Sequence, residues 1–302
     1  MKETHTSKSD LTGNPDRLHG GPLPDVARLG IVNFINTAPI CIPWQEMGPL
    51  EGWVVEEGPP TFLNMRLAEG RLDVGLVSSF AYGLDAERYF LLPDLGISAT
   101  GPVGSVILFS RRPLRELHGK YVLLTPHSAT SVNLLYIILE NFLGIEPLYK
   151  TGRFQELESD PSTVAYLAIG DEALRLKASD KRLFQWDLAE IWLRNTGLPF
   201  VFAVWAVRKK SWNRISGRIS ALFRRLVTCY NTGRNDMARI SRLVAPRIPM
   251  DPGQCLDYLE GIELDLSMEK QKGLLHFFSL LHERGGFPEV TELDILPALD
   301  EL

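Results

Sequence analysis

Hydrophobic residues in the first part of the chain occur in short runs that alternate with helical patterns. The run that begins at Ala27 (ARLGIVNF) is rich in branched residues and predicts a buried strand, so we expect the folded body to start there. Further strands are expected at residues 50–56, 72–77, 89–97 and 103–110, with a short helix at 60–69. Alternating strands and helices favour a parallel sheet with helices on its faces. This part is therefore predicted to be an α/β unit.

A second α/β unit is predicted beyond residue 110. Its expected elements are a strand at 121–125, a long apolar helix (SVNLLYIILENFLG) that ends at Gly144, a strand at 163–170, a helix from Asp171, a short strand near Leu183, a helix at 187–195 and a strand at 198–207. From Ser211 onward the pattern is mostly helical. We expect two lobes, one formed by residues 26–109 with 206–302 and the other by 110–205, with a ligand between them. Residues 1–25 are polar, contain Gly and Pro, and are expected to form a flexible tail.

Composition and charge exclude several classes of protein. The 302 residues are 45% hydrophobic and 23% charged, which is close to the average for globular proteins and argues against a disordered chain. The formal net charge of −5 gives no electrostatic reason to bind nucleic acid. The longest apolar run, at 199–207, is too short for the roughly 18 residues of a membrane span. Because the first 25 residues also lack the apolar stretch of a secretory signal, we expect a cytoplasmic protein that does not bind a membrane.

The cysteines and histidines form no recognisable metal or redox site. Cys41, Cys229 and Cys255 are widely spaced and odd in number, so we expect reduced thiols. His276 and His282 are six residues apart, which does not place them on one helix face for a metal. The sequence also lacks the H-E-x-x-H, P-loop and G-x-G-x-x-G motifs. No metal and no cofactor are therefore expected.

Two polar residues follow or open predicted strands where a ligand would bind. Asn36 comes after the first strand, and its neutral amide suits the orientation of a carboxylate or a hydroxyl; the alternative is an ordinary cap on a helix that begins near Pro39. Ser105 lies just inside the strand expected to cross between the lobes, where its hydroxyl is either a ligand donor or a structural group. No G-x-S-x-G elbow surrounds Ser105, so a serine nucleophile has weak support.

Two further loops lead into helices. In the loop at 125–131 (TPHSATS), backbone N–H groups and hydroxyls converge on a helix N-terminus, which suits an anion as well as a plain cap. His127 is the only histidine in these loops, and a surface or packing role is the alternative to a base. In the other loop, Gly170 permits close approach of a ligand, and Asp171 is either a base or a helix cap.

Seven strings in order resemble the chorismate dehydratases of the futalosine route to menaquinone: LGIVNFINTAPI, LAEGRLDVGLVSS, LLPDLGIS, GPVGSVILFS, SATSVNLL, AIGDEAL and TGLPFVFAVWA. The resemblance covers roughly residues 27–210. It implies an α/β, two-lobed fold like type II periplasmic binding proteins, followed by a helical C-terminal region. It also implies a lyase that removes water from chorismate, with chorismate in the cleft as its small-molecule partner.

The resemblance assigns roles to residues of this chain. It places the key asparagine on Asn36 and the cleft serine on Ser105, and both are expected to be catalytic. Substrate binding is expected from two loops, at Ser128, Ala129, Thr130 and Ser131 and at Gly170 and Asp171. Two alternatives remain: a non-catalytic cytosolic protein of the same fold that binds a small anion, and the sister enzyme dihydroxynaphthoate synthase.

Overall fold

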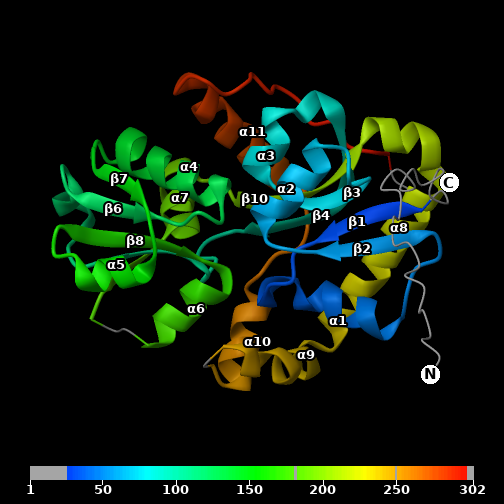
Figure 1. Ribbon diagram of the computed structural model, residues 1–302, viewed down its shortest axis with the longest axis horizontal. Coiled ribbons are helices and arrows are strands. Elements are labelled where there is room, and N and C mark those ends of the chain that lie inside the picture. The colour runs from blue at the N-terminus through cyan, green and yellow to red at the C-terminus, as the bar shows by residue number, and fades with distance from the viewer. Residues whose placement is uncertain (1–25, 180–181, 249, 298–302) are drawn as a thin grey trace, which may run out of the picture.

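The computed structural model describes residues 26–179, 182–248 and 250–297, and the predicted tail at 1–25 lies outside them. Two five-stranded sheets form the centres of two lobes (Figure 1). The first sheet has the order β2-β1-β3-β10-β4, with β1 (Ala27–Ile31), β2 (Trp53–Glu57), β3 (Val74–Ser78), β4 (Tyr89–Ala99) and β10 (Phe200–Arg208). The second has the order β7-β6-β8-β5-β9, with β5 (Val106–Ser110), β6 (Tyr121–Leu124), β7 (Leu148–Thr151), β8 (Thr163–Ile169) and β9 (Phe184–Asp187).

The helices cover the sheets and form most of the C-terminal third. They are α1 (Ala38–Glu46), α2 (Pro60–Ala68), α3 (Ser79–Leu84), α4 (Ala129–Tyr136) with a π-helical continuation (Ile137–Phe142), α5 (Phe154–Ser159), α6 (Gly170–Ser179), α7 (Leu188–Thr196), α8 (Lys209–Asn235), α9 (Met237–Val244), α10 (Pro252–Glu260) and α11 (Met268–Glu283). Short 3-10 turns occur at Ile35–Thr37, Ala86–Arg88, Leu114–Leu117 and Ala245–Arg247. The predicted helical region after residue 211 is therefore present as α8 to α11.

The sheets are mixed, whereas the sequence pattern favoured a parallel sheet. Strands β1, β2 and β3 are parallel, as are β6, β7 and β8, but β10 is antiparallel to β3 and β4, and β5 is antiparallel to β8 and β9. Each reversed strand is the first one after the chain crosses between the lobes. It starts at the cleft and runs away from it, whereas its neighbours end there, and local periodicity carries no information about this direction.

The crossings lie closer to the cleft than residues 110 and 205, where the sequence pattern placed them. Val106–Ser110 pairs with β8 and β9 along its whole length, and Phe200–Arg208 pairs with β3 and β4. The chain therefore passes to the second sheet within residues 100–105 and returns within 197–199. Both crossing segments border the space between the lobes.

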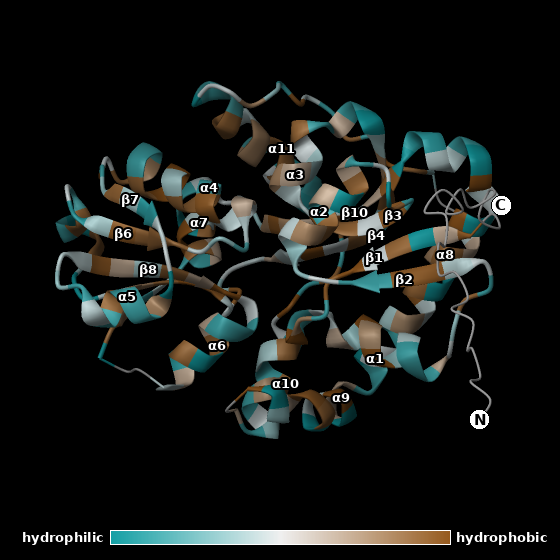
Figure 2. Cartoon of the chain, in the orientation of Figure 1, coloured by the Kyte–Doolittle hydropathy of each residue, from teal (hydrophilic) through white to brown (hydrophobic). Residues whose placement is uncertain are grey.

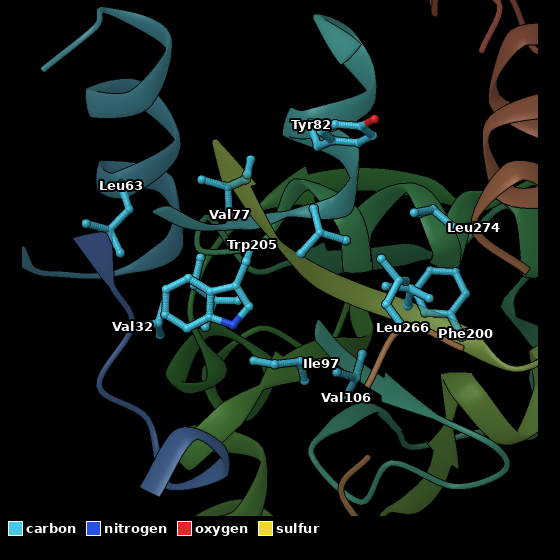
Figure 3. Packing of buried hydrophobic residues seen from close by; sticks show 14 of the residues in the cluster. Val32, Leu63, Val77, Tyr82, Ile97, Val106, Phe200, Trp205, Leu266 and Leu274 are labelled. Atoms are coloured by element: carbon cyan, nitrogen blue, oxygen red, sulfur yellow. The ribbon is translucent and has the colours of Figure 1, made fainter. Parts of the chain in front are cut away.

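A continuous apolar core extends through both sheets. Figure 2 shows the hydrophobic colouring concentrated on the strands and the hydrophilic colouring on the outer helix faces, the pattern expected for covered sheets. Figure 3 shows part of this core, with Val32, Val77, Ile97 and Val106 among the packed side chains. No helix of the described residues is long and apolar enough to cross a membrane.

Helices α1 and α8 approach each other unusually closely at Gly233. A Cβ atom at this position would lie 1.9 Å from the carbonyl oxygen of Pro39, near the start of α1. Only glycine leaves room for this contact. The contact fixes α1, and with it the turn that holds Asn36, against the long helix α8.

Candidate functional site

A mostly apolar cavity lies between the two sheets and receives side chains from both lobes. It holds about 610 Å³ of space between protein atoms, counting the part that opens to solvent. Its lining consists of Val32, Phe34, Asn36, Pro60, Leu76, Val77, Ser78, Ile97, Val103, Ser105, Val106, Ser128, Ser131, Ile169, Gly170, Phe202 and Ala203. Five of the eight predicted site residues are in this lining: Asn36, Ser105, Ser128, Ser131 and Gly170.

Asn36 projects into the cavity from the 3-10 turn Ile35–Thr37. The turn is fixed by Thr37, whose hydroxyl donates to the carbonyl oxygens of Val32 (2.7 Å) and Phe34 (2.8 Å). Thr37 is also the residue at the N-cap position of α1, and Asn36 makes no capping hydrogen bond there. The Oδ1 atom of Asn36 is buried without a hydrogen-bond partner in the structure. A helix cap would use this oxygen to accept a backbone N–H, so the structure does not support the helix-cap alternative.

Ser105 is 2% exposed and immediately precedes β5. Its hydroxyl accepts a hydrogen bond from the Tyr258 hydroxyl (2.9 Å), and its carbonyl oxygen accepts one from the backbone N–H of Gly170 (2.7 Å). The segment before it is held by Asp187, whose carboxylate accepts hydrogen bonds from the backbone N–H groups of Val103 (3.2 Å) and Gly104 (2.7 Å). Burial raises the pKa of the Asp187 carboxyl, although these N–H groups oppose the shift.

The N-terminus of α4 forms the side of the cavity that belongs to the second lobe. Ser128 is the N-cap, and its hydroxyl oxygen accepts a hydrogen bond from the backbone N–H of Ser131 (3.1 Å). The Ser128 hydroxyl in turn donates to the Ser131 hydroxyl (2.9 Å). Ser128 therefore caps α4 and also lines the cavity, so the predicted cap is present, and the predicted anion site remains a prediction.

Three predicted binding residues do not line the cavity. Ala129 is absent from the lining, and Thr130 accepts a hydrogen bond from the backbone N–H of Phe80 (3.0 Å) on α3 of the first lobe. Asp171 accepts one from the backbone N–H of Ile35 (3.0 Å) and pairs with Arg247 (3.7 Å). Thr130 and Asp171 thus join the two lobes instead of facing the cavity, because contacts distant in sequence occupy their polar atoms.

Gly170 lines the cavity in a conformation that favours glycine. Its φ is +55°, and a Cβ atom would lie 3.2 Å from the ring of Phe34 across the cleft. His127 is exposed and outside the lining, and its backbone N–H donates to the Thr125 hydroxyl (3.3 Å). The surface alternative for this histidine therefore agrees with its position.

Sequence reasoning missed one polar residue in the cavity lining, Ser78, and one behind it, Tyr258. Ser78 ends β3 and caps α3, and its hydroxyl also accepts a hydrogen bond from Asn64 (3.0 Å). Ser78 could have been predicted from its position at the end of a strand, which is the pattern that indicated Asn36. Tyr258 approaches from α10, 153 residues away from Ser105, and no local pattern indicates that contact.

The cavity lining is neutral. Among the residues that the structure describes, those in the lining carry no ionisable side chain, and the same residues contain no group of three His, Cys, Asp or Glu side chains placed to hold a metal ion. Cys41, Cys229 and Cys255 are free and buried, as expected for reduced thiols, and burial raises the pKa of Cys41 to about 11. The polar groups available to a ligand are hydroxyls, one amide and backbone N–H groups.

Comparison with known protein families shows to which family this chain belongs. Residues 27–283 match the family described as menaquinone biosynthesis. The chain belongs to this family. A chorismate dehydratase from Thermus thermophilus is 31% identical over 268 residues, which cover 84% of this chain and 94% of that protein. A chorismate dehydratase from Campylobacter jejuni is 28% identical over 187 residues, 60% of this chain and 68% of that protein. The resemblance predicted from seven short strings is thus confirmed.

Solved structures show that this menaquinone biosynthesis protein shares the fold of periplasmic binding proteins. Protein AF1704 from Archaeoglobus fulgidus has a TM-score of 0.68 at 16% identity and covers 87% of this chain and 98% of its own. The alkanesulfonate-binding protein SsuA from Xanthomonas axonopodis, bound to MOPS, has a TM-score of 0.65 at 15% identity, covering 88% and 95%. At such identities the likeness concerns the fold alone, and the predicted two-lobed fold is confirmed.

Proposed function

We propose that this protein dehydrates chorismate to 3-[(1-carboxyvinyl)oxy]benzoate, the first step of the futalosine route to menaquinone. The observation that carries the proposal is the neutral cavity, in which Asn36 of one lobe faces Ser105, Ser128 and the N-terminus of α4 from the other. The relationship to chorismate dehydratases supports the choice of substrate. Asn36 and Ser105 are the proposed catalytic residues.

The proposed site suits a dianion that must be oriented without a metal. Each carboxylate of chorismate needs hydrogen-bond donors, and charge-assisted hydrogen bonds to neutral donors are strong in a cavity that excludes water. The Asn36 amide, the Ser105 hydroxyl and the α4 N-terminus provide such donors from three directions. The apolar walls limit the access of water to these donors, and Phe34 and Phe202 in the lining offer apolar surface to the substrate ring.

Dehydration removes the ring hydroxyl and the hydrogen on the neighbouring carbon that bears the ether oxygen. Loss of that hydrogen as a proton leaves its electron pair to form the new ring double bond, and the C–O bond to the hydroxyl breaks with release of water. The proton is acidified through the ring double bond conjugated to the ring carboxylate. Because the described lining offers no ionisable base, we assign proton acceptance to the enolpyruvyl carboxylate of the substrate, held in place by Asn36. The carboxylic acid so formed passes the proton to the departing hydroxyl oxygen, so that water leaves and the carboxylate is restored.

The deciding experiment is incubation of the protein with chorismate while the ultraviolet absorbance of the aromatic product is followed. We expect chorismate to disappear and one equivalent of the substituted benzoate to form. Chorismate that is bound but recovered unchanged would favour the alternative of a binding protein. Failure to bind chorismate at all would reject the substrate and leave the sister synthase to be tested.

Replacement of Ser105 by Ala is expected to weaken catalysis without unfolding the protein. The variant loses one hydrogen bond to a charged group, worth about 1.5–3 kcal/mol of transition-state stabilisation. The melting temperature is expected to fall by only a few degrees, because the loss inside the protein is limited to the partner of Tyr258. Steady-state rates and melting curves measure both quantities. Unchanged rates with a much lower melting temperature would identify Ser105 as structural.

The rate is expected to change little between about pH 6 and pH 9. The described lining has no ionisable side chain, and burial raises the pKa of Tyr258 behind Ser105, so its hydroxyl stays protonated as the pH rises through this range. Below about pH 4 the rate should fall as substrate carboxylates are protonated. A profile of kcat/KM against pH tests this. A bell-shaped profile centred between pH 6 and pH 9 would show that a protein group exchanges the proton.

A further inference from the structure

Tyr258 connects the C-terminal helices to the proposed site through Ser105. Its hydroxyl donates a hydrogen bond to the Ser105 hydroxyl oxygen over 2.9 Å. The tyrosine ring also packs against the backbone just before Ser105, because a Cβ atom on Gly104 would lie 3.4 Å from it. Tyr258 itself is absent from the cavity lining. It therefore reaches the site from behind Ser105.

The direction of this hydrogen bond determines what the serine proton can do. A hydroxyl has one proton to donate and two lone pairs to accept with. Tyr258 is half-buried, and the desolvation of its hydroxyl raises its pKa, so it remains a donor. Because Ser105 accepts from Tyr258, the seryl proton stays available for another acceptor. The cavity is the space in which Ser105 meets such an acceptor.

The helix that carries Tyr258 is itself fixed against both lobes. A separate apolar cluster contains Ile35 from the Asn36 turn, Leu174 from α6, and Ile240, Cys255 and Leu259 from α9 and α10, with Tyr258 packed at its edge. Figure 1 shows α9 and α10 below the space between α6 and α1. Arg247, between α9 and α10, donates hydrogen bonds to the side-chain oxygen (3.1 Å) and the carbonyl oxygen (2.7 Å) of Asn33. This pair of helices thus braces the loops of both proposed catalytic residues.

We propose that Tyr258 is a positioning residue, which holds the Ser105 hydroxyl so that its proton points to an anionic oxygen of chorismate. The proposal rests on the proposed function and adds a residue beyond the seven resembling strings, the last of which ends near residue 210. Removing the tyrosine hydroxyl frees the serine to rotate and to turn its proton toward other acceptors. The loss of the Tyr258 hydroxyl should therefore affect catalysis only by changing the orientation of the Ser105 hydroxyl.

The test is a double-mutant cycle in the full chain with Tyr258→Phe, Ser105→Ala and the double variant. We expect Tyr258→Phe alone to lower kcat/KM for chorismate about tenfold, the value of one ordinary hydrogen bond. In the Ser105→Ala background the same change should lower it less than about twofold, because no hydroxyl remains to be oriented. Tyr230→Phe on α8, a half-buried tyrosine outside the cavity lining, is the control and should leave kcat/KM unchanged.

Assays run below the onset of melting of the least stable variant keep every protein folded. Equal losses from Tyr258→Phe in both backgrounds would show a general structural effect and overturn the proposal. An unchanged kcat/KM in Tyr258→Phe would overturn it as well. Failure of the proposed function is a separate result, because the wild-type protein would then leave chorismate unconsumed.

Discussion

Replacing Asn36 by Asp is expected to reduce chorismate turnover about a thousandfold while the protein stays folded. Asp removes the two amide N–H donors and places a negative charge beside a dianion. Two like charges about 4 Å apart repel by about 4 kcal/mol at an effective dielectric constant near 20, which corresponds to roughly a thousandfold in rate. The fold should tolerate the change, since the Oδ1 atom of Asn36 has no partner to lose.

Asn36→Ala separates the loss of donors from the added charge. It removes the amide without introducing repulsion, so we expect a loss of about ten- to a hundredfold, smaller than in the Asp variant. Steady-state kinetics, binding measurements and melting curves for both variants make the comparison. Retained binding with lost turnover would assign Asn36 to the chemical step. Turnover close to wild type in Asn36→Asp would remove Asn36 from the proposed catalytic residues.

Replacing Gly233 by Ala is expected to destabilise the protein by about 3 kcal/mol and to reduce turnover about a hundredfold. The new methyl group would lie 1.9 Å from the carbonyl oxygen of Pro39, and backbone on both sides prevents relief by a side-chain rotation. Helices α1 and α8 must therefore move apart by about 1 Å, and a displacement of that size near a reacting group costs about a hundredfold. Pro39 is only three residues from Asn36, so the displacement reaches the site.

Gly217 on the same helix provides the matched control. It is exposed, and a Cβ atom there would meet nothing within 4 Å. Ala at this position should leave turnover unchanged and stability equal or slightly higher, by at most about 1 kcal/mol. Chemical denaturation and steady-state kinetics of the two variants test the contact. Equal stability of Gly233→Ala and Gly217→Ala would contradict the close approach of α1 and α8.

The alternation of strands and helices was predictable because it is encoded in local periodicity. The strand at Ala27, the helix at Pro60–Ala68 and the helical region after residue 211 all follow from such patterns. The reversal of β5 and β10 was not predictable in this way, because strand direction depends on where the chain crosses between lobes. For the same reason the expected crossings between lobes, at residues 110 and 205, lie several residues after the observed ones.

The residues of the proposed site were likewise predictable only where a local sequence pattern marks them. Asn36, Ser105, Ser128 and Gly170 were found because strand ends and helix starts are recognisable in sequence and lie at the cleft. Asp171 looked equally suitable, yet the backbone N–H of Ile35 occupies its carboxylate from 136 residues away. Tyr258 could not be predicted as a site residue, because its hydrogen-bond partner Ser105 is 153 residues away in the sequence. The role of a polar residue depends on its hydrogen-bond partners, and partners that are distant in the sequence cannot be predicted from the spacing of a local motif.

The position of β10 has a consequence for how the protein is assembled. β10 pairs with both β3 and β4, although the entire second sheet precedes it in the chain. During synthesis, the second lobe is complete before β10 emerges, whereas the 11-residue strand β4 still lacks its neighbouring strand. Such distant pairings form slowly, and unpaired strands associate readily with other chains. A nascent chain stopped before residue 200 therefore presents two open sheet edges, and the arrival of a single strand removes both.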